Sequence, residues 1–139
     1  MFFKILKYIK MKTRIITGLI LAVCLFSSGC NKDNVPPKVV SSYPESGAQN
    51  LDPDTKEIWV KFNEPMTDKS WSWSYKDKSK FPEKTGEPQY TEDYTKCILP
   101  VQLKPDQEYD ILVNTEKFRN FKDKAGNAAV SFELKFKTK

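Results

Sequence analysis

The stretch Glu57-Ile58-Trp59-Val60-Lys61-Phe62 decides the fold class of this chain. Ile58, Val60 and Phe62 occupy every second position, which places their side chains on one face of a β-strand. Alternation of this kind is typical of antiparallel sheets with one face in the core and the other in solvent. The stretch therefore predicts an all-β fold.

Alternation of the same period recurs further along the chain and defines other expected strands. Its inward positions are Cys97, Leu99, Val101 and Leu103 in residues 97–103, Tyr109, Ile111 and Val113 in residues 108–113, and Val130, Phe132, Leu134 and Phe136 in residues 130–137. Turn-forming sequences separate the strands, as at residues 44–47, 52–54, 104–106 and 125–127. About 100 residues of short strands with such turns predict a single antiparallel β-sandwich.

The N-terminus has the parts of an export signal. Five basic residues precede a nearly uncharged apolar run at residues 15–26. This run is too short to span a membrane, because a helix needs about 20 apolar residues to cross the hydrocarbon core. The following Leu25-Phe26-Ser27-Ser28-Gly29-Cys30 resembles the lipobox of bacterial lipoproteins, with Ser27 where an aliphatic residue is usual. The resemblance implies cleavage before Cys30 and attachment of a diacylglyceryl group to its thiol.

Three alternatives to this interpretation stay open. The segment is otherwise an ordinary signal peptide or an uncleaved anchor, and Cys24 is a weaker site for the lipid because the bulky Val23 precedes it. Translation starts at either Met1 or Met11, since Met11-Lys12-Thr13-Arg14 is by itself a conventional beginning of a signal.

The expected organisation is a signal peptide at residues 1–29, a lipidated cysteine and tether at residues 30–37, and one folded domain at residues 38–139. Lys32-Asp33 resembles a thin version of the charged tag that follows the cysteine in lipoproteins exported to the cell surface. We therefore expect an outer-membrane protein, anchored to the membrane through Cys30 and facing the surface or the periplasm.

Charge and residue types exclude several classes of function. The signal contains five of the 23 Lys and Arg residues and none of the 18 acidic ones, so the remainder is balanced at 18 against 18. The excess of positive charge thus belongs to export, and we expect no nucleic-acid partner. The chain has no histidine, which excludes Ser-His-Asp and Cys-His catalysis and histidine metal sites.

Cysteine usage agrees with a non-catalytic domain. Once Cys24 is removed and Cys30 is lipidated, Cys97 has no partner for a disulfide, and its place on an apolar strand face predicts an inert buried thiol. No cofactor or catalytic residue is expected. A glycosidase pair drawn from the carboxylates near residues 64–93 is a distant alternative, because their spacing does not distinguish an active pair from surface acids.

Several motifs together resemble one protein family. They are Pro37-Lys38-Val39-Val40-Ser41-Ser42-Tyr43-Pro44-Glu45-Ser46-Gly47-Ala48, then Val60-Lys61-Phe62-Asn63-Glu64-Pro65-Met66, then Leu103-Lys104-Pro105-Asp106-Gln107-Glu108-Tyr109, and finally Asp123-Lys124-Ala125-Gly126-Asn127 with a last strand ending Phe136-Lys137-Thr138. This series is similar to the bacterial Ig-like domain of the SbsA type and covers residues 36–139. The resemblance implies an Ig-like sandwich acting as a spacer, adhesion or accessory module.

One departure from the family pattern suggests a ligand. Residues 67–94 are rich in aromatic side chains, and a strand at Ser70-Trp71-Ser72-Trp73-Ser74-Tyr75 would project Trp71, Trp73 and Tyr75 from one face. Such a row could stack on a glycan or on an envelope protein, and Phe81 and Tyr90 follow nearby. The competing interpretation is that these rings fill the core between the sheets.

A calcium site was the remaining candidate for a metal. Asp52, Asp54 and Asp123 would supply oxygen ligands if one end of the sandwich brought them together. Because Asp is also a common turn residue, turn formation explains all three without a metal, and we expect no metal site.

Overall fold

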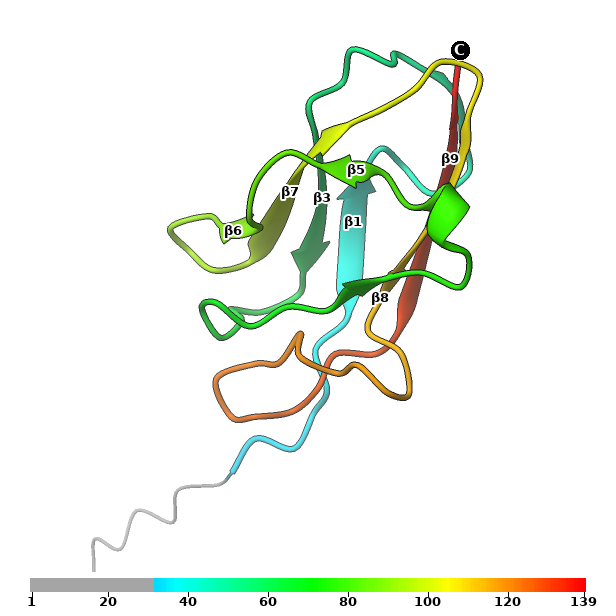
Figure 1. Ribbon diagram of the computed structural model, residues 1–139. Helices are drawn as coiled ribbons and strands as arrows, with labels where there is room; N and C mark the ends of the chain where they lie inside the picture. Colours follow the sequence, from blue (N-terminus) through cyan, green and yellow to red (C-terminus); the bar gives the residue numbers. More distant parts are fainter. Residues whose placement is uncertain (1–31) are drawn as a thin grey trace, which may run out of the picture. The chain divides into compact units, whose positions relative to one another are not determined.

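Short β-strands arranged in two sheets make up the computed structural model, which describes residues 32–139 (Figure 1). In chain order they are β1 (Val39–Tyr43), β2 (Ala48–Leu51), β3 (Glu57–Phe62), β4 (Trp73–Ser74), β5 (Glu83–Lys84), β6 (Gln89–Tyr90), β7 (Lys96–Gln102), β8 (Glu108–Val113) and β9 (Phe132–Thr138), with one 3₁₀ turn, η1 (Lys78–Lys80). Within this range no helix is long and apolar enough to cross a membrane.

The first sheet has the order β1-β3-β7-β5, with β6 also paired to β7, and the second has the order β2-β9-β8-β4. All pairings are antiparallel except that of β2 with β9, which is parallel. The predicted all-β sandwich is therefore confirmed, with one parallel pairing at the edge of the second sheet. The chain passes from β1 in one sheet to β2 in the other through the turn at residues 44–47, so β2 runs in the direction of β9.

The core lies between the two sheets and confirms the alternation read from the sequence. Ile58, Val60 and Phe62 of β3 are at most 1% exposed. The inward positions of β7 and β8 are buried as expected, and they divide between two adjoining clusters. Val130 departs from the expected pattern: it is 55% exposed and precedes β9, because its backbone N–H is bonded to the carbonyl of Pro37 instead of to a neighbouring strand.

A buried polar side chain with several hydrogen bonds is Asn114, which follows β8 and is 1% exposed. Its Nδ2 donates to the carbonyls of Phe121 and Ala129 at 3.0 Å each, and its Oδ1 accepts from the N–H of Phe121 at 3.0 Å. The backbone of Asn114 adopts φ 57°, a left-handed conformation that Asn tolerates better than most residues. One amide thus holds both ends of the long β8–β9 loop (residues 114–131) against the domain.

A second anchor closes the opposite end of the sandwich. The hydroxyl of Tyr109 accepts from the N–H of Lys104 at 2.8 Å, and the buried Thr138 hydroxyl donates to the carbonyl of Lys104 at 2.6 Å. This geometry gives a physical reason for the motif of residues 103–109. The hydroxyl of Tyr109, at the end of the motif, binds the backbone of Lys104, where the turn of the motif begins.

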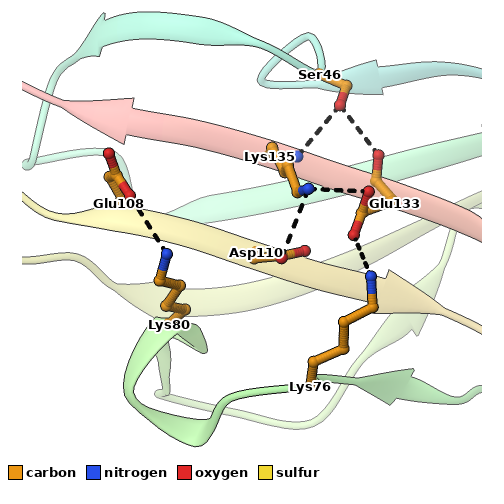
Figure 2. A network of polar contacts seen from close by, with 7 residues as sticks. All are labelled: Ser46, Lys76, Lys80, Glu108, Asp110, Glu133 and Lys135. Atoms are coloured by element: carbon orange, nitrogen blue, oxygen red, sulfur yellow. Dashed lines mark hydrogen bonds and ion pairs between the residues drawn. The ribbon is translucent and has the colours of Figure 1, made fainter.

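The outer face of the second sheet carries a network of ion pairs (Figure 2). Lys76 Nζ lies 2.8 Å from Glu133 Oε1, and Lys135 Nζ lies 3.1 Å from Glu133 Oε2. Lys80 of η1 pairs with Glu108 at 3.3 Å. The network fastens residues 76–80, which connect β4 to β5, onto β8 and β9.

The first described residues lie along the β8–β9 loop. Asn127 Nδ2 donates to the carbonyl of Asp33 at 3.0 Å, and Pro37 is buried beside Val130. Asp33 and Pro37, which belong to the expected tether of residues 30–37, are therefore bonded to the β8–β9 loop. The predicted signal peptide and the lipid site at Cys30 lie outside the described residues.

We expect Asn114→Ala to lower the free energy of unfolding by about 3 kcal/mol, because the N–H of Phe121 and the carbonyl of Ala129 lose their partner and the carbonyl of Phe121 loses one of its two. Asn50→Ala is the matched control, since Asn50 has φ 61° but is exposed; it should cost about 1 kcal/mol, the penalty of the left-handed backbone alone. Urea unfolding measures both values, and equal losses would contradict a special role of the Asn114 side chain.

The ion-pair network predicts a pH dependence. Hydrogen bonds from Lys76 and Lys135 lower the pKa of Glu133 from 4.5 to about 2. The depressed pKa stabilises the folded state above pH 4.5, and this contribution is lost as the pH falls towards 2. Glu133→Gln should cost roughly 0.5 kcal/mol at pH 7, as exposed pairs do, and nothing near pH 2. Thermal melts at the two pH values check this, with Glu57→Gln as a control that should be neutral at both.

An aromatic groove as the candidate binding site

The aromatic row expected at residues 70–75 forms a strand over two residues only. Trp73 and Ser74 pair with Val113 and Leu112 of β8, so β4 is a short edge of the second sheet. Before it, the Ser72 hydroxyl is buried and accepts from the N–H of Asn120 at 2.9 Å. The carbonyl of Ser72 accepts from the N–H of Asn114 at 3.1 Å. Both the side chain and the backbone of Ser72 are thus bonded to the β8–β9 loop instead of to a neighbouring strand.

The three aromatic residues have different environments, which the sequence alone did not distinguish. Trp73 packs against both core clusters and meets the ring of Phe121 edge-on, with 5.5 Å between ring centres. Trp71 is half-buried, with its ring 6.4 Å from that of Tyr90. Tyr75 is 43% exposed. The core interpretation therefore fits Trp73 best, and Tyr75 least.

All three side chains nevertheless line one groove, with a volume of about 520 Å³. The Phe81 ring, 5.3 Å from that of Tyr75, lies on the connection from β4 to β5. Phe118, 55% exposed, comes from the β8–β9 loop. Rings from three separate parts of the chain thus surround one open space. A volume of this size with mostly aromatic walls is typical of sites for small organic ligands.

Polar groups complete the lining. Ser74, Lys84 and Asn120 all border the groove. None of their side-chain polar atoms forms a hydrogen bond or ion pair with another residue of 32–139. Hydroxyl, ammonium and amide groups are therefore available for a ligand that combines apolar faces with hydroxyl groups.

The β4–β5 connection, which carries Tyr75 and Phe81, is held in place by electrostatics. Lys76 and Lys80 pair with β9 and β8 on either side of η1 (Figure 2). The Asp77 carboxylate accepts from the N–H of Ser79 at 2.9 Å and caps η1, and this bond lowers the pKa of Asp77. The position of these two rings therefore depends on contacts outside the groove.

No catalytic geometry accompanies the groove among residues 32–139. Cys97 is fully buried, and burial raises the pKa of its thiol to about 12. It therefore stays protonated and inaccessible, as the sequence predicts. Tyr90, beneath Trp71, also has a raised pKa through burial, and its hydroxyl donates to the carbonyl of Ser70 at 3.0 Å.

A second aromatic patch lies on the outer face of the first sheet. Trp59 stacks on Tyr43 with 6.2 Å between ring centres, and Lys96 Nζ lies 4.3 Å from the centre of the Trp59 ring. Cross-strand pairing of Tyr43 with Trp59 creates this arrangement. The rings of this patch and the Lys96 side chain contact one another, whereas the groove combines rings from three separate segments, so the groove is the stronger candidate.

The acidic residues considered for calcium do not meet. Asp52 pairs with Lys139 at 2.7 Å at the C-terminal end. Asp123 lies near Met66 and binds Asn127 through both carboxylate oxygens at 2.8 Å each. Its carboxylate neighbours are Asp33 and Glu64, with ligand atoms within 4.8 Å of one another. Desolvation and the negative charges of Asp123 and Asp33 raise the pKa of Glu64.

Sequence reasoning missed part of the groove. Phe118 and Asn120 lie more than 40 residues beyond β4 and follow no alternating pattern, so no periodic signal links them to Trp71. The one available clue was Asn114, an Asn directly after an apolar strand, which is typical of a left-handed residue that starts a loop.

Comparison with known proteins places the domain among Ig-like sequences. A family model described as "Bacterial Ig-like domain" matches residues 33–138. No curated protein matches the chain significantly. Among solved structures, the recombinant bacterial S-layer protein SbsC, its domains 1–6 and its N-terminal part are similar, each with a TM-score of 0.47 and 18% identity. The alignments cover 74–75% of this chain but only 14%, 14% and 24% of those chains.

Two substitutions should separate core from groove. Trp73→Ala should lower the free energy of unfolding by about 3 kcal/mol, because it leaves a cavity between the two clusters. Tyr75→Ala should cost less than about 1 kcal/mol, since the ring is largely exposed. Chemical denaturation measures both. Similar losses for the two variants would contradict the different environments of the rings.

Proposed function

Because the chain belongs to the bacterial Ig-like domain family, we propose that it is a non-catalytic module of the cell envelope with a binding, adhesion or structural role. The match over residues 33–138 carries this proposal, since domains of this family are typically non-catalytic. The buried Cys97 thiol and the lack of histidine support the same conclusion from the chemistry of the chain itself.

The proposed attachment is a lipid on Cys30 that holds the module on the outer membrane, facing the surface or the periplasm. The residues of 25–30 support it, because small side chains precede a cysteine after a basic and apolar segment. A diacylated cysteine would provide the membrane partner without a spanning helix.

We expect mass spectrometry of the protein purified from membranes to find Cys30 as the first residue, carrying diacylglyceryl and an N-terminal fatty acid such as palmitate. Cys30→Ser should release the protein from the membrane fraction, whereas Cys24→Ser should leave it there. A mature chain that begins elsewhere, or a Cys30 without lipid, would refute the anchor.

The groove favours a second, more specific function, namely glycan binding by an accessory lipoprotein. Exposed Tyr75 and Phe118 lie on separate segments around one space of about 520 Å³. Sugar rings have apolar faces that can stack on such side chains. Their hydroxyl groups can form hydrogen bonds with the polar side chains of Ser74, Lys84 and Asn120. This combination of aromatic walls with a few polar groups is the observation that supports a glycan ligand.

A glycan array with residues 32–139 tests this proposal, since both core clusters and every named strand lie within that range. For any glycan that binds, Tyr75→Ala and Phe118→Ala should each weaken binding at least tenfold without a change in melting temperature. Tyr43→Ala is the matched control, because Tyr43 is 42% exposed on the other sheet, and it should bind normally. Unchanged binding in the two groove variants would exclude the groove.

A further inference from the structure

We propose that the β8–β9 loop is a membrane-contacting surface that binds the anionic headgroups of the bilayer in which the protein is anchored. The inference rests on the proposed lipid at Cys30. It adds an orientation: the sandwich stands on the end formed by this loop, and its C-terminal end points away from the membrane.

The chain between the anchor and the domain is short. Asp33 is bonded to Asn127 of the loop at 3.0 Å, and it lies three positions beyond Cys30, with two residues between them. Three fully extended residues span at most about 11 Å. A lipid on Cys30 therefore keeps this part of the loop within about that distance of the bilayer surface.

Figure 1 shows the same relation in the arrangement of the chain. Residues 32–38 run beside the loop at one end of the sandwich, and the C-terminus lies at the other end. The N–H of Val130 donates to the carbonyl of Pro37 at 2.8 Å, so the loop is tied to this segment at a second point. The domain cannot turn its loop away from the anchor without breaking these bonds.

The β8–β9 loop is also rich in basic side chains. The loop carries four exposed cations, Lys117, Arg119, Lys122 and Lys124, against one exposed carboxylate, Glu116. Its other acidic residue, Asp123, is 2% exposed and bonded to Asn127. Clusters of basic residues beside a lipid anchor are attracted to anionic headgroups. Carboxylates also lie near the loop: Asp33 and Glu64 are beside Asp123, and Asp93 in a neighbouring turn keeps its negative charge, which hydrogen bonds from Thr91 and Thr95 stabilise.

Only some cations of the domain are paired with carboxylates. Ion pairs within residues 32–139 use Lys76 and Lys80 of the β4–β5 connection, and Lys135, Lys137 and Lys139 at the C-terminal end of the chain, as Figure 2 illustrates for three of them. Other lysines of this range, such as Lys56 and Lys104, form no ion pair either. The four loop cations form no ion pair within that range. Lys124 lies 5.1 Å from the centre of the Tyr94 ring. Their charge is thus available to an external anion.

Exposed apolar side chains lie at the same end. Val130 is 55% exposed and Val35 is 66% exposed, and both flank the contact between the loop and residues 33–37. Apolar groups among cations are typical of surfaces that rest in the interface of a bilayer. The combination favours a lipid surface over a purely polar anionic ligand.

The test uses the full chain, processed in cells and reconstituted in vesicles. A fluorophore on A125C, in the exposed turn of the loop, reports contact, and one on D54C at the opposite end is the control. The label is specific because Cys97 is fully buried and Cys30 carries the lipid. Vesicles contain phosphatidylcholine with or without phosphatidylglycerol, together with a lipid whose headgroup quenches the fluorophore.

We expect at least twofold stronger quenching for the A125C label than for the D54C label on anionic vesicles. The excess should disappear in 1 M salt, since screening is then effective beyond about 3 Å, and in the K122E/K124E variant of the labelled chain. Because the salt arm needs no further substitution, the result does not depend on how that variant folds.

The possible failures are distinguishable. Equal quenching of the two labels on vesicles that retain the protein would overturn the membrane-contacting surface and leave the lipid anchor intact. If the loop label is quenched more strongly but to the same extent on neutral and anionic vesicles and at low and high salt, the loop does not bind anionic headgroups. A protein that no vesicle retains, with no lipid on Cys30, would overturn the anchor and this inference together.

Discussion

The side-chain amide of Asn114 is the interaction on which the functional end of the domain depends. It satisfies backbone groups at Phe121 and Ala129, and the backbone N–H of the same residue bonds Ser72. Buried backbone groups must find partners, and a long loop without strands has few of its own. Asn114 therefore fixes both ends of the β8–β9 loop, and bonds from Thr67 and Ser72 hold its middle.

Two surfaces depend on that loop. Phe118 and Asn120 form one wall of the aromatic groove, and the loop cations lie beside the segment that leads to Cys30. Binding in the groove and contact with the bilayer would therefore use neighbouring parts of one structural unit. A ligand in the groove would be held close to the membrane, as suits an accessory module of the envelope.

The alternation of apolar residues predicted the strands well because burial between two sheets imposes a period of two. β3 and β8 begin and end where the pattern indicated, and their inward side chains are buried. The pattern was less informative at Val130 and at residues 70–75. There the N–H of Val130 donates to the carbonyl of Pro37, and the hydroxyl of Ser72 accepts from the N–H of Asn120. The period of the side chains carries no information about such contacts.

Sequence by itself determined the fold class, the inert thiol of Cys97 and the residues of the candidate lipid site, since each follows from local pattern or composition. Only the tertiary structure decided that Trp73 packs in the core while Tyr75 and Phe118 face a groove, and that Asp123 joins Asp33 and Glu64 and not Asp52. These outcomes depend on which distant loops meet at one end of the sandwich. Long-range backbone hydrogen bonds and core packing set that arrangement, and no periodicity in the chain records them.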